Sequence, residues 1–310
     1  MTPKFRVGVV GTGSIGKNHA RIVSELPNVE FAAIYDANPK TAAEIGAKLG
    51  VRAVSTLEEF IPLVDAATIA TPTPFHYPVA KALLEAGKHC LVEKPITETT
   101  SDAKALSELA KRTGLVLQVG HIERFNPVLK VLESQLTEAR FIEAHRLSPY
   151  PNRSIEIGVV LDLMIHDLEI VLHLVRSPVV SVDAVGIPVL SKGEDIANAR
   201  IRFENGCVAN LTASRISPEK MRKIRVFQHN AYLSLDYQNQ TGEIFRLANG
   251  KIGRETVEIE KEEPLKREIA SFVQCAQAGA QPKVTGAEGA AALALAIQIT
   301  HQIEAAGVKA

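Results

Sequence analysis

The sequence predicts an α/β fold in two parts. The first part is a doubly wound parallel sheet, and the second is an α+β domain with a large, mostly antiparallel open sheet. Apolar strands alternate with helical segments from residue 5 to about 120, which is typical of a parallel sheet covered on both faces. Strands then dominate from 179 to 259, with two Asn-Gly hairpin signals. We therefore expect domains at 1–121 and 122–310.

Each element of the first part has a local signal. An apolar strand runs directly into a glycine loop, and the helix expected at 15–26 places Ile15, Ile22 and Leu26 among polar residues. Gly87 ends a later helix. The remaining expected elements are strands at 29–35, 64–70, 89–93 and 115–119, and helices at 75–86 and 101–112.

The second part begins with a helix at 125–136, a strand at 140–150 and a strongly apolar helix at 159–175. The expected strands that follow are 182–188, 197–204, 207–214, 223–228, 231–236, 244–247 and 256–259, and helices at 265–278 and 286–306 close the chain. One face of this open sheet needs cover. A second copy, in a homodimer or homotetramer, is the expected provider.

Composition excludes several classes of partner. Lys plus Arg and Asp plus Glu number 35 each, so the net charge is zero, and nothing favours nucleic acid or an anionic membrane. No apolar run approaches the roughly 20 residues of a membrane span, and the N-terminus has no signal-peptide pattern. The three cysteines are far apart in the sequence. We expect free thiols and a cytoplasmic protein.

The most informative motif is Gly11-Thr12-Gly13-Ser14-Ile15-Gly16, between an apolar strand and a helix. The first glycine permits a tight turn, the second lets the backbone approach a pyrophosphate, and the third lets helix and strand pack closely. The helix start adds N–H groups and the positive end of its dipole. The motif predicts a dinucleotide-binding Rossmann domain, with a structural glycine turn as the alternative.

Asp36 ends the second strand, twenty residues after the loop. A carboxylate at this place can accept hydrogen bonds from a ribose diol, and it repels a 2′-phosphate. Among the next four residues Lys40 alone is basic. We therefore expect NAD rather than NADP, although Asp36 could also cap the following helix.

Two clusters could carry chemistry. Glu93-Lys94-Pro95 ends a strand at the sheet edge where ligands bind, although a surface lysine is the alternative. Asp162 and His166 are four residues apart on an apolar helix, so they share a face. They predict a general acid/base histidine held by a carboxylate. The alternatives are a buried Asp–His pair and, with Glu169 and His173, a metal site, but no second ligand cluster supports a metal.

A third cluster, His121, Arg124 and Asn126, lies at the expected domain boundary. These polar side chains could line a cleft that binds substrate. The alternative is a hinge followed by a capped helix start.

Taken together, the motifs resemble the Gfo/Idh/MocA family of sugar-oxidising dehydrogenases over essentially the whole chain. The resemblance implies that Thr71, Pro72 and His76 form the loop beside the nicotinamide, and that Glu93-Lys94-Pro95 is the signature tripeptide. It also implies that the catalytic helix carries Asp162 and His166. One departure is visible: Ile157-Gly158-Val159 has a single glycine where many members have two or three.

The family implies oxidation of a secondary hydroxyl by NAD. His166 would take the hydroxyl proton, with Asp162 orienting it and Lys94 donating a hydrogen bond, or Lys94 would itself be the base. Residues 119–127 are most similar to UDP-N-acetylglucosamine 3-dehydrogenases, which implies oxidation of the 3-OH of a UDP-N-acetylhexosamine. The expected substrate contacts are His121, Arg124, Asn126, Tyr150, Arg153 and His166, and the arginines considered for the diphosphate are Arg124, Arg146, Arg153 and Arg215.

Two other activities fit the same motifs. One is a dehydrogenase of a free cyclitol or monosaccharide, and the other is a glycoside hydrolase that uses NAD transiently. A binding protein with a vestigial site is disfavoured, because Lys94, Asp162 and His166 are all present.

Overall fold

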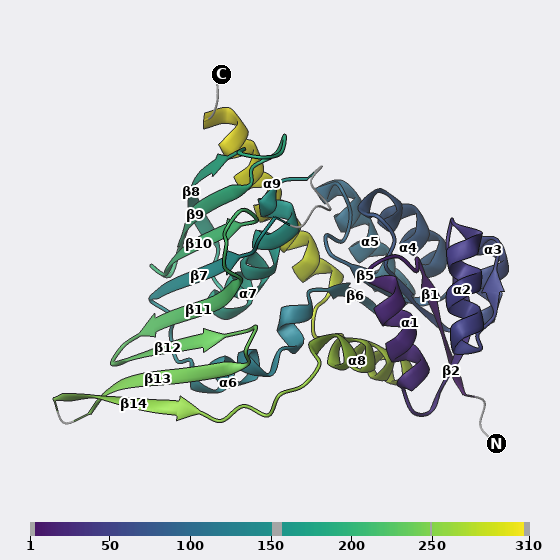
Figure 1. Ribbon diagram of the computed structural model, residues 1–310, viewed down its shortest axis with the longest axis horizontal. Coiled ribbons are helices and arrows are strands. Elements are labelled where there is room, and N and C mark those ends of the chain that lie inside the picture. The colour runs from purple at the N-terminus through teal and green to yellow at the C-terminus, as the bar shows by residue number, and fades with distance from the viewer. Residues whose placement is uncertain (1–3, 151–156, 249, 307–310) are drawn as a thin grey trace. The chain divides into compact units, whose positions relative to one another are not determined.

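A computed structural model describes residues 4–150, 157–248 and 250–306 (Figure 1). The chain forms two compact units, residues 1–122 with 263–290 and residues 123–262 with 291–310. The first contains a parallel sheet and the second a mostly antiparallel one, so the predicted fold class is confirmed. Within the described residues, no helix is both long enough and apolar enough to span a bilayer.

The first unit is built on six parallel strands in the order β3-β2-β1-β4-β5-β6. The strands are β1 (Phe5–Val10), β2 (Val29–Tyr35), β3 (Ala53–Val54), β4 (Ala66–Ile69), β5 (His89–Glu93) and β6 (Leu117–Gly120). Their helices are α1 (Gly16–Glu25), α2 (Pro39–Leu49), α3 (Leu57–Phe60), α4 (His76–Glu85), α5 (Thr100–Thr113) and α8 (Pro264–Ala278). Because parallel strands share one direction, the loops that follow β1, β2, β4 and β5 lie at the same edge.

Helix α8 corrects the expected domain division, which placed residues 263–290 in the second domain. Its buried residues include Ile269 and Phe272, and these join the core formed by β1, β5 and α1. Figure 1 shows α8 beside α1. The sequence prediction placed this helix in the second domain because it comes late in the chain. In the structure its apolar face packs in the core of the parallel sheet.

The second unit is built on eight strands in the order β14-β13-β12-β11-β7-β10-β9-β8, antiparallel except for the β7–β10 pair. The strands are β7 (Phe141–Leu147), β8 (Val179–Ile187), β9 (Ile196–Phe203), β10 (Val208–Ser214), β11 (Met221–Gln228), β12 (Ala231–Asp236), β13 (Thr241–Ala248) and β14 (Lys251–Val257). The helices are α6 (Pro127–Gln135), the π-helical turn η4 (Val160–Met164), α7 (Ile165–Val175) and α9 (Gly286–Ala306).

One face of this sheet is the core and the other carries an aromatic row. Alternate residues of β7, such as Ile142 and Ala144, are buried in one cluster with residues of α6, α7 and α9. On the opposite face the rings of Phe141, Phe227, Tyr232 and Phe245 follow one another across four strands, and the last two stack with centroids 4.3 Å apart. Among the described residues, helices therefore cover one side of this sheet and not the other.

Candidate active site

In the glycine loop after β1, the first and last glycines have no room for a side chain, whereas the middle glycine faces open space. Gly11 has a φ of +85°, and a Cβ there would lie 2.8 Å from the Ala70 carbonyl. A Cβ on Gly16 would lie 1.9 Å from the carbonyl oxygen of Gly11, whereas one on Gly13 would meet no described atom within 4 Å. The N-cap position of α1 is Ile15, whose side chain has no hydrogen-bond acceptor. The loop therefore leaves room for an anion at the start of the helix.

Asp36 lies at the end of β2 and faces this loop. Its Oδ2 accepts hydrogen bonds from the backbone N–H of Thr12 (2.6 Å) and from Thr12 Oγ1 (2.8 Å), and its Oδ1 accepts one from the N–H of Asn38 (2.8 Å). The carboxylate is thus fixed in place and keeps lone pairs for further donors. A ribose diol is such a donor, and an additional phosphate is not.

The loop after β4 is joined to the chain after β5 by a buried histidine. His76 lies 2.8 Å from the carbonyl oxygen of Thr71 through Nε2 and 2.8 Å from that of Pro95 through Nδ1. Burial lowers the pKa of His76, although both carbonyls favour its charged form. The Oγ1 of Thr71 is buried and has no hydrogen-bond partner in the described part of the chain, so this loop has an unsatisfied polar atom to offer a ligand.

Glu93 and Lys94 are held at the end of β5, and the Lys94–Pro95 peptide bond is cis. Glu93 Oε1 lies 3.0 Å from Nε2 of the fully buried His19, and Oε2 accepts the N–H of Lys94 at 3.2 Å. Burial opposes ionisation of Glu93, but the hydrogen bond from His19 and the charge of Lys94 hold its pKa below the ordinary value. A Cβ on Gly120 of the adjacent strand would lie 3.1 Å from Glu93. The carboxylate is therefore a fixed negative charge beside Lys94.

A second acid, Glu268 of α8, is fully buried near this cluster. Neither carboxylate oxygen has a hydrogen-bond partner among the described residues. Burial, and then the negative charge of Glu93, raise the pKa of Glu268 well above its ordinary value. Burial therefore favours the protonated form of Glu268, because an unpaired carboxylate is too costly to bury.

We expect the Glu268→Gln variant to gain stability over the native chain as pH rises. Between the unfolded pKa of about 4.3 and the raised folded pKa, the folded chain holds one proton more than the unfolded chain. Its unfolding free energy therefore falls with increasing pH, whereas glutamine does not titrate. Urea denaturation at pH 5 and pH 8 measures this difference, with Glu44→Gln on the exposed surface of α2 as the control. An equal stability difference at both pH values would contradict a raised pKa of Glu268.

In the second unit, η4 and α7 carry Asp162 and His166. Both residues are partly exposed on a helix whose other residues are largely buried. The N–H of Asp162 donates to the carbonyl of Gly158 at 3.1 Å. Turns of π-helix occur often at functional sites. The residues that would extend a metal site are engaged elsewhere, because Glu169 pairs with Arg124 and His173 lies 2.6 Å from Glu133.

A buried charge network lies beneath α7. Arg146 of β7 donates to both oxygens of Asp167, at 2.8 and 2.9 Å, and to Glu123 at 2.9 Å. Burial alone would lower the pKa of Arg146, but the two carboxylates raise it further above its ordinary value. Arg222 on the adjacent strand lies 3.6 Å from Glu123 and is partly exposed. This network fixes the residue that follows His166.

The structure gives several expected substrate contacts a structural role instead. Arg124 is buried in an ion pair with Glu169. Asn126 is buried, and it caps α6 by accepting the N–H of Val128 at 3.2 Å while donating to Glu123. Arg146 and Arg215 are likewise buried and paired with carboxylates, with Asp167 and Asp195 respectively, so all three guanidinium groups hold internal ion pairs. Of the remaining contacts, His121 is buried, Tyr150 is partly exposed, and Arg153 lies outside the described residues.

Two residues near Lys94 were absent from the sequence prediction. His19 has a weak sequence signal, because it lies on the apolar side of α1 three residues before Ile22. Glu268 has none, since nothing local marks an acid 174 positions after Lys94 as its neighbour. Only tertiary packing brings α8 against this sheet.

Comparison with protein families gives one matching family model in each unit. A family model described as an oxidoreductase family with an NAD-binding Rossmann fold matches residues 5–121. A second model, the GFO/IDH/MocA C-terminal domain, matches residues 131–234.

Individual relatives point to sugar dehydrogenases. UDP-N-acetylglucosamine 3-dehydrogenase of Acidithiobacillus ferrooxidans is 37% identical over 97% of this chain and 98% of its own. A solved structure of that enzyme superposes with a TM-score of 0.93 over 98% of this chain and 99% of its own. A scyllo-inositol 2-dehydrogenase of Bacillus subtilis is 29% identical over 70% of this chain and 69% of its own.

Proposed function

The chain belongs to the Gfo/Idh/MocA oxidoreductase family, and on that premise we propose that it oxidises the 3-OH of a UDP-N-acetylhexosamine to a ketone. The observation that supports this substrate most strongly is the relative that is 37% identical over 97% of the chain. The chain is an NAD-binding oxidoreductase. The proposal concerns the sugar, the carbon atom and the residues that act.

The first unit fits NAD on three observations. Gly13 leaves the middle of the loop open, Asp36 is fixed with acceptor capacity to spare, and Thr71 has a buried hydroxyl without a partner among the described residues. These residues would hold the pyrophosphate, the adenosine ribose and the nicotinamide end respectively. When bound, NAD⁺ supplies the acceptor for the hydride that leaves the carbinol carbon.

The proposed acid–base groups are Lys94, His166 and Asp162. An alcohol that loses hydride must also lose its hydroxyl proton, and an imidazole that is neutral can accept it. The Lys94 ammonium would stabilise negative charge developing on the same oxygen, and the Glu93 carboxylate accepts the backbone N–H of Lys94 beside it. In the other assignment, Lys94 accepts the hydroxyl proton and His166 donates the hydrogen bond to the alcohol oxygen. In both, Asp162 orients the imidazole.

A substrate screen tests the proposal. UDP-N-acetylglucosamine, UDP-N-acetylgalactosamine, myo-inositol, scyllo-inositol and free hexoses are incubated with the protein and NAD⁺, and NADH is followed by its absorbance. We expect NADH with a UDP-N-acetylhexosamine, and a 3-keto product by mass spectrometry and NMR. NADH with the inositols alone would favour the cyclitol alternative, for which the inositol 2-dehydrogenase relative speaks. Glycoside cleavage without net NADH would favour the hydrolase.

We expect kcat/KM to be at least about tenfold higher with NAD than with NADP. The 2′-phosphate would bring negative charge against the Asp36 carboxylate, and two like charges 4 Å apart repel by about 1 to 4 kcal/mol between water and a partly buried site. Parallel kinetics with both cofactors measure the ratio, and Asp36→Asn is expected to narrow it. Equal turnover with NAD and NADP in the native chain would refute the predicted preference for NAD.

We further propose that a second copy covers the open face of the large sheet. Beside the aromatic row, this face exposes Val185, Ile187, Leu247 and Ile252, the last with 76% of its surface accessible. Exposed apolar side chains in this number are costly in a monomer. Analytical ultracentrifugation at micromolar concentration is expected to give a dimer or tetramer, and Ile252→Lys is expected to weaken it. A native chain that sediments as a monomer would refute this assembly.

A further inference from the structure

The helix that carries Asp162 and His166 begins without a cap of its own. Its N-cap residue is Val159, whose side chain cannot accept a hydrogen bond. The first N–H groups of a helix have no acceptor within the helix and need one from elsewhere. Gly158 is the glycine that directly precedes this helix, in Ile157-Gly158-Val159. The structure shows what that glycine accommodates.

The acceptors come from Glu194, thirty-five positions after Val159. The backbone carbonyl of Glu194 accepts the N–H of Val159 at 2.9 Å, and its side-chain Oε1 accepts the N–H of Val160 at 3.2 Å. A Cβ on Gly158 would lie 2.0 Å from the same Oε1. The carboxylate therefore lies directly against the glycine and at the positive end of the helix dipole.

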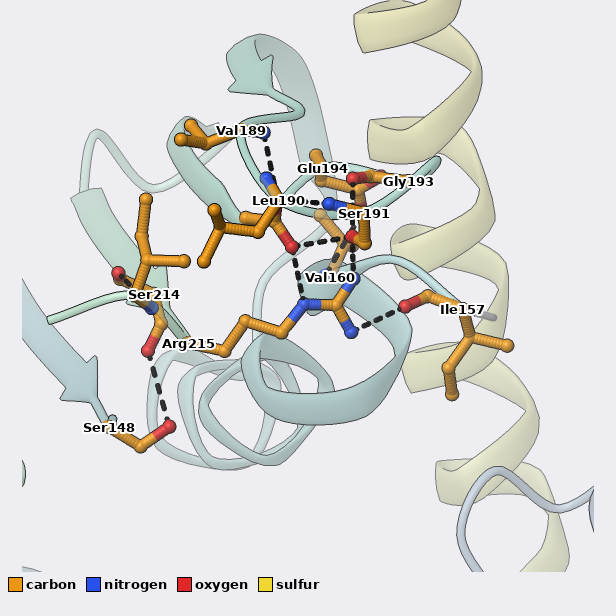
Figure 2. A network of polar contacts seen from close by, with 12 residues as sticks. Ser148, Ile157, Val160, Val189, Leu190, Ser191, Gly193, Glu194, Ser214 and Arg215 are labelled. Atoms are coloured by element: carbon orange, nitrogen blue, oxygen red, sulfur yellow. Dashed lines mark hydrogen bonds and ion pairs between the residues drawn. The ribbon is translucent and has the colours of Figure 1, made fainter. Parts of the chain in front are cut away.

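Glu194 is held there by a buried clamp formed by its neighbour (Figure 2). Asp195 Oδ2 accepts the backbone N–H groups of Val189, Leu190 and Ser191 at 2.5–2.9 Å. Its Oδ1 accepts Nε of Arg215 at 2.8 Å and the hydroxyl of Ser191 at 2.5 Å. Although burial opposes ionisation, these donors hold the pKa of Asp195 well below its ordinary value. These hydrogen bonds fix the backbone of the loop before Glu194 to the Asp195 carboxylate.

Arg215 also contacts the segment that precedes the helix. Arg215 is fully buried, and its Nη1 donates to the carbonyl of Ile157 at 2.8 Å, one residue before Gly158. A Cβ on Gly193 would lie 3.1 Å from the backbone of Gly158. The loop at 188–195 and the start of the helix are thus fixed to one another on both sides of Glu194.

We propose that Glu194 is a positioning residue for acid–base catalysis, which fixes the first turn of the helix and hence the directions of Asp162 and His166. This inference rests on the proposed function of those two residues. A π-helical turn is a sparsely populated conformation that persists only where its surroundings hold it. Glu194 supplies that support from outside the helix, and a displacement of about 1 Å at acid–base groups is enough to lower rates by about 10²-fold.

The test compares Glu194→Ala with Glu194→Gln. Alanine removes the side-chain acceptor, and we expect kcat to fall by about 10- to 100-fold with an altered pH profile and an unchanged affinity for NADH. Glutamine keeps an oxygen acceptor, and we expect it to restore most of kcat. Glu204→Ala, which removes an exposed carboxylate at the end of β9, is the control and is expected to leave kcat unchanged.

Two further measurements keep the inference separate from the proposed function. Hydrogen exchange followed by mass spectrometry is expected to accelerate at residues 157–164 in Glu194→Ala and to stay native in α6. Gly158→Ala is expected to lower kcat in the same way, and adding it to Glu194→Ala is expected to cost little more, because both act on one contact. Unchanged exchange at 157–164, or faster exchange with native kcat and pH profile, would overturn the role of Glu194. A native chain that oxidises no sugar would instead refute the proposed function, and exchange would still report on the clamp.

Discussion

Replacing Lys94 or His166 by alanine is expected to lower kcat by about 10²- to 10⁴-fold, the range that positioned acid–base groups contribute. Each side chain would act on the alcohol oxygen only as its charge develops, so the loss belongs to the chemical step and NADH should still bind. Pre-steady-state hydride transfer and NADH fluorescence titration measure the two properties separately.

The controls for this prediction are Lys104→Ala and His301→Ala. Both remove the same type of side chain from an exposed position in the same unit as its counterpart. The pH profiles also decide between the two assignments of the base, because the acid limb of kcat is lost with whichever residue accepts the proton. Near-native turnover in both site variants would exclude them from the chemistry.

Replacing Arg146 by methionine is expected to destabilise the second unit by about 3–5 kcal/mol. The change keeps most of the side-chain volume, but it leaves Asp167 and Glu123 buried without their principal partner. Arg222, 3.6 Å from Glu123, can offset part of that loss. Urea denaturation followed by circular dichroism measures the change, and NADH binding reports whether the first unit stays folded.

The matched control for Arg146 lies on the adjacent strand. Arg225 of β11 pairs with Glu143 of β7 on the opposite face of the sheet, where its side chain is 46% exposed. Arg225→Met is expected to cost less than about 1 kcal/mol, because water screens an exposed ion pair. Adding Asp167→Leu and Glu123→Leu to Arg146→Met is expected to recover stability, since uncompensated buried charge is the cause of the loss. Equal effects of Arg146→Met and Arg225→Met would contradict a buried network.

Secondary structure followed closely from local sequence. The expected ranges of β2, β5, β12 and α9 agree with the structure residue for residue. Strand β14 did not follow: it was expected at 256–259 and spans Lys251–Val257, because its exposed residues lack a regular apolar pattern and its extent is set by pairing with β13. Periodicity reports burial of one face, and it fails where neither face is buried.

The candidate site was predictable only where a motif is continuous in sequence. Gly11–Gly16 and Asp36 could be read from the chain because the turn, the strand end and the helix start are local. For Arg124 and Asn126 the sequence leaves two alternatives open, substrate contacts or a capped helix start at the boundary, because their partners are not marked by a motif. A polar side chain at a boundary looks the same in sequence whether it faces a ligand or a buried acid, and the acid that pairs with Arg124 lies 45 residues away at Glu169.

The sequence by itself predicted a dinucleotide site on a parallel sheet, because the turn, the strand end and the helix start are local features. The family followed from the resemblance of its motifs, which the family model confirms. Only the tertiary structure decided which charges are buried in internal ion pairs. It alone assigned α8 to the parallel sheet, placed Glu268 near Glu93 and brought Glu194 to the start of the helix that carries Asp162. The physical reason is that desolvation and pairing depend on atoms tens to hundreds of residues away, and no local pattern records those partners.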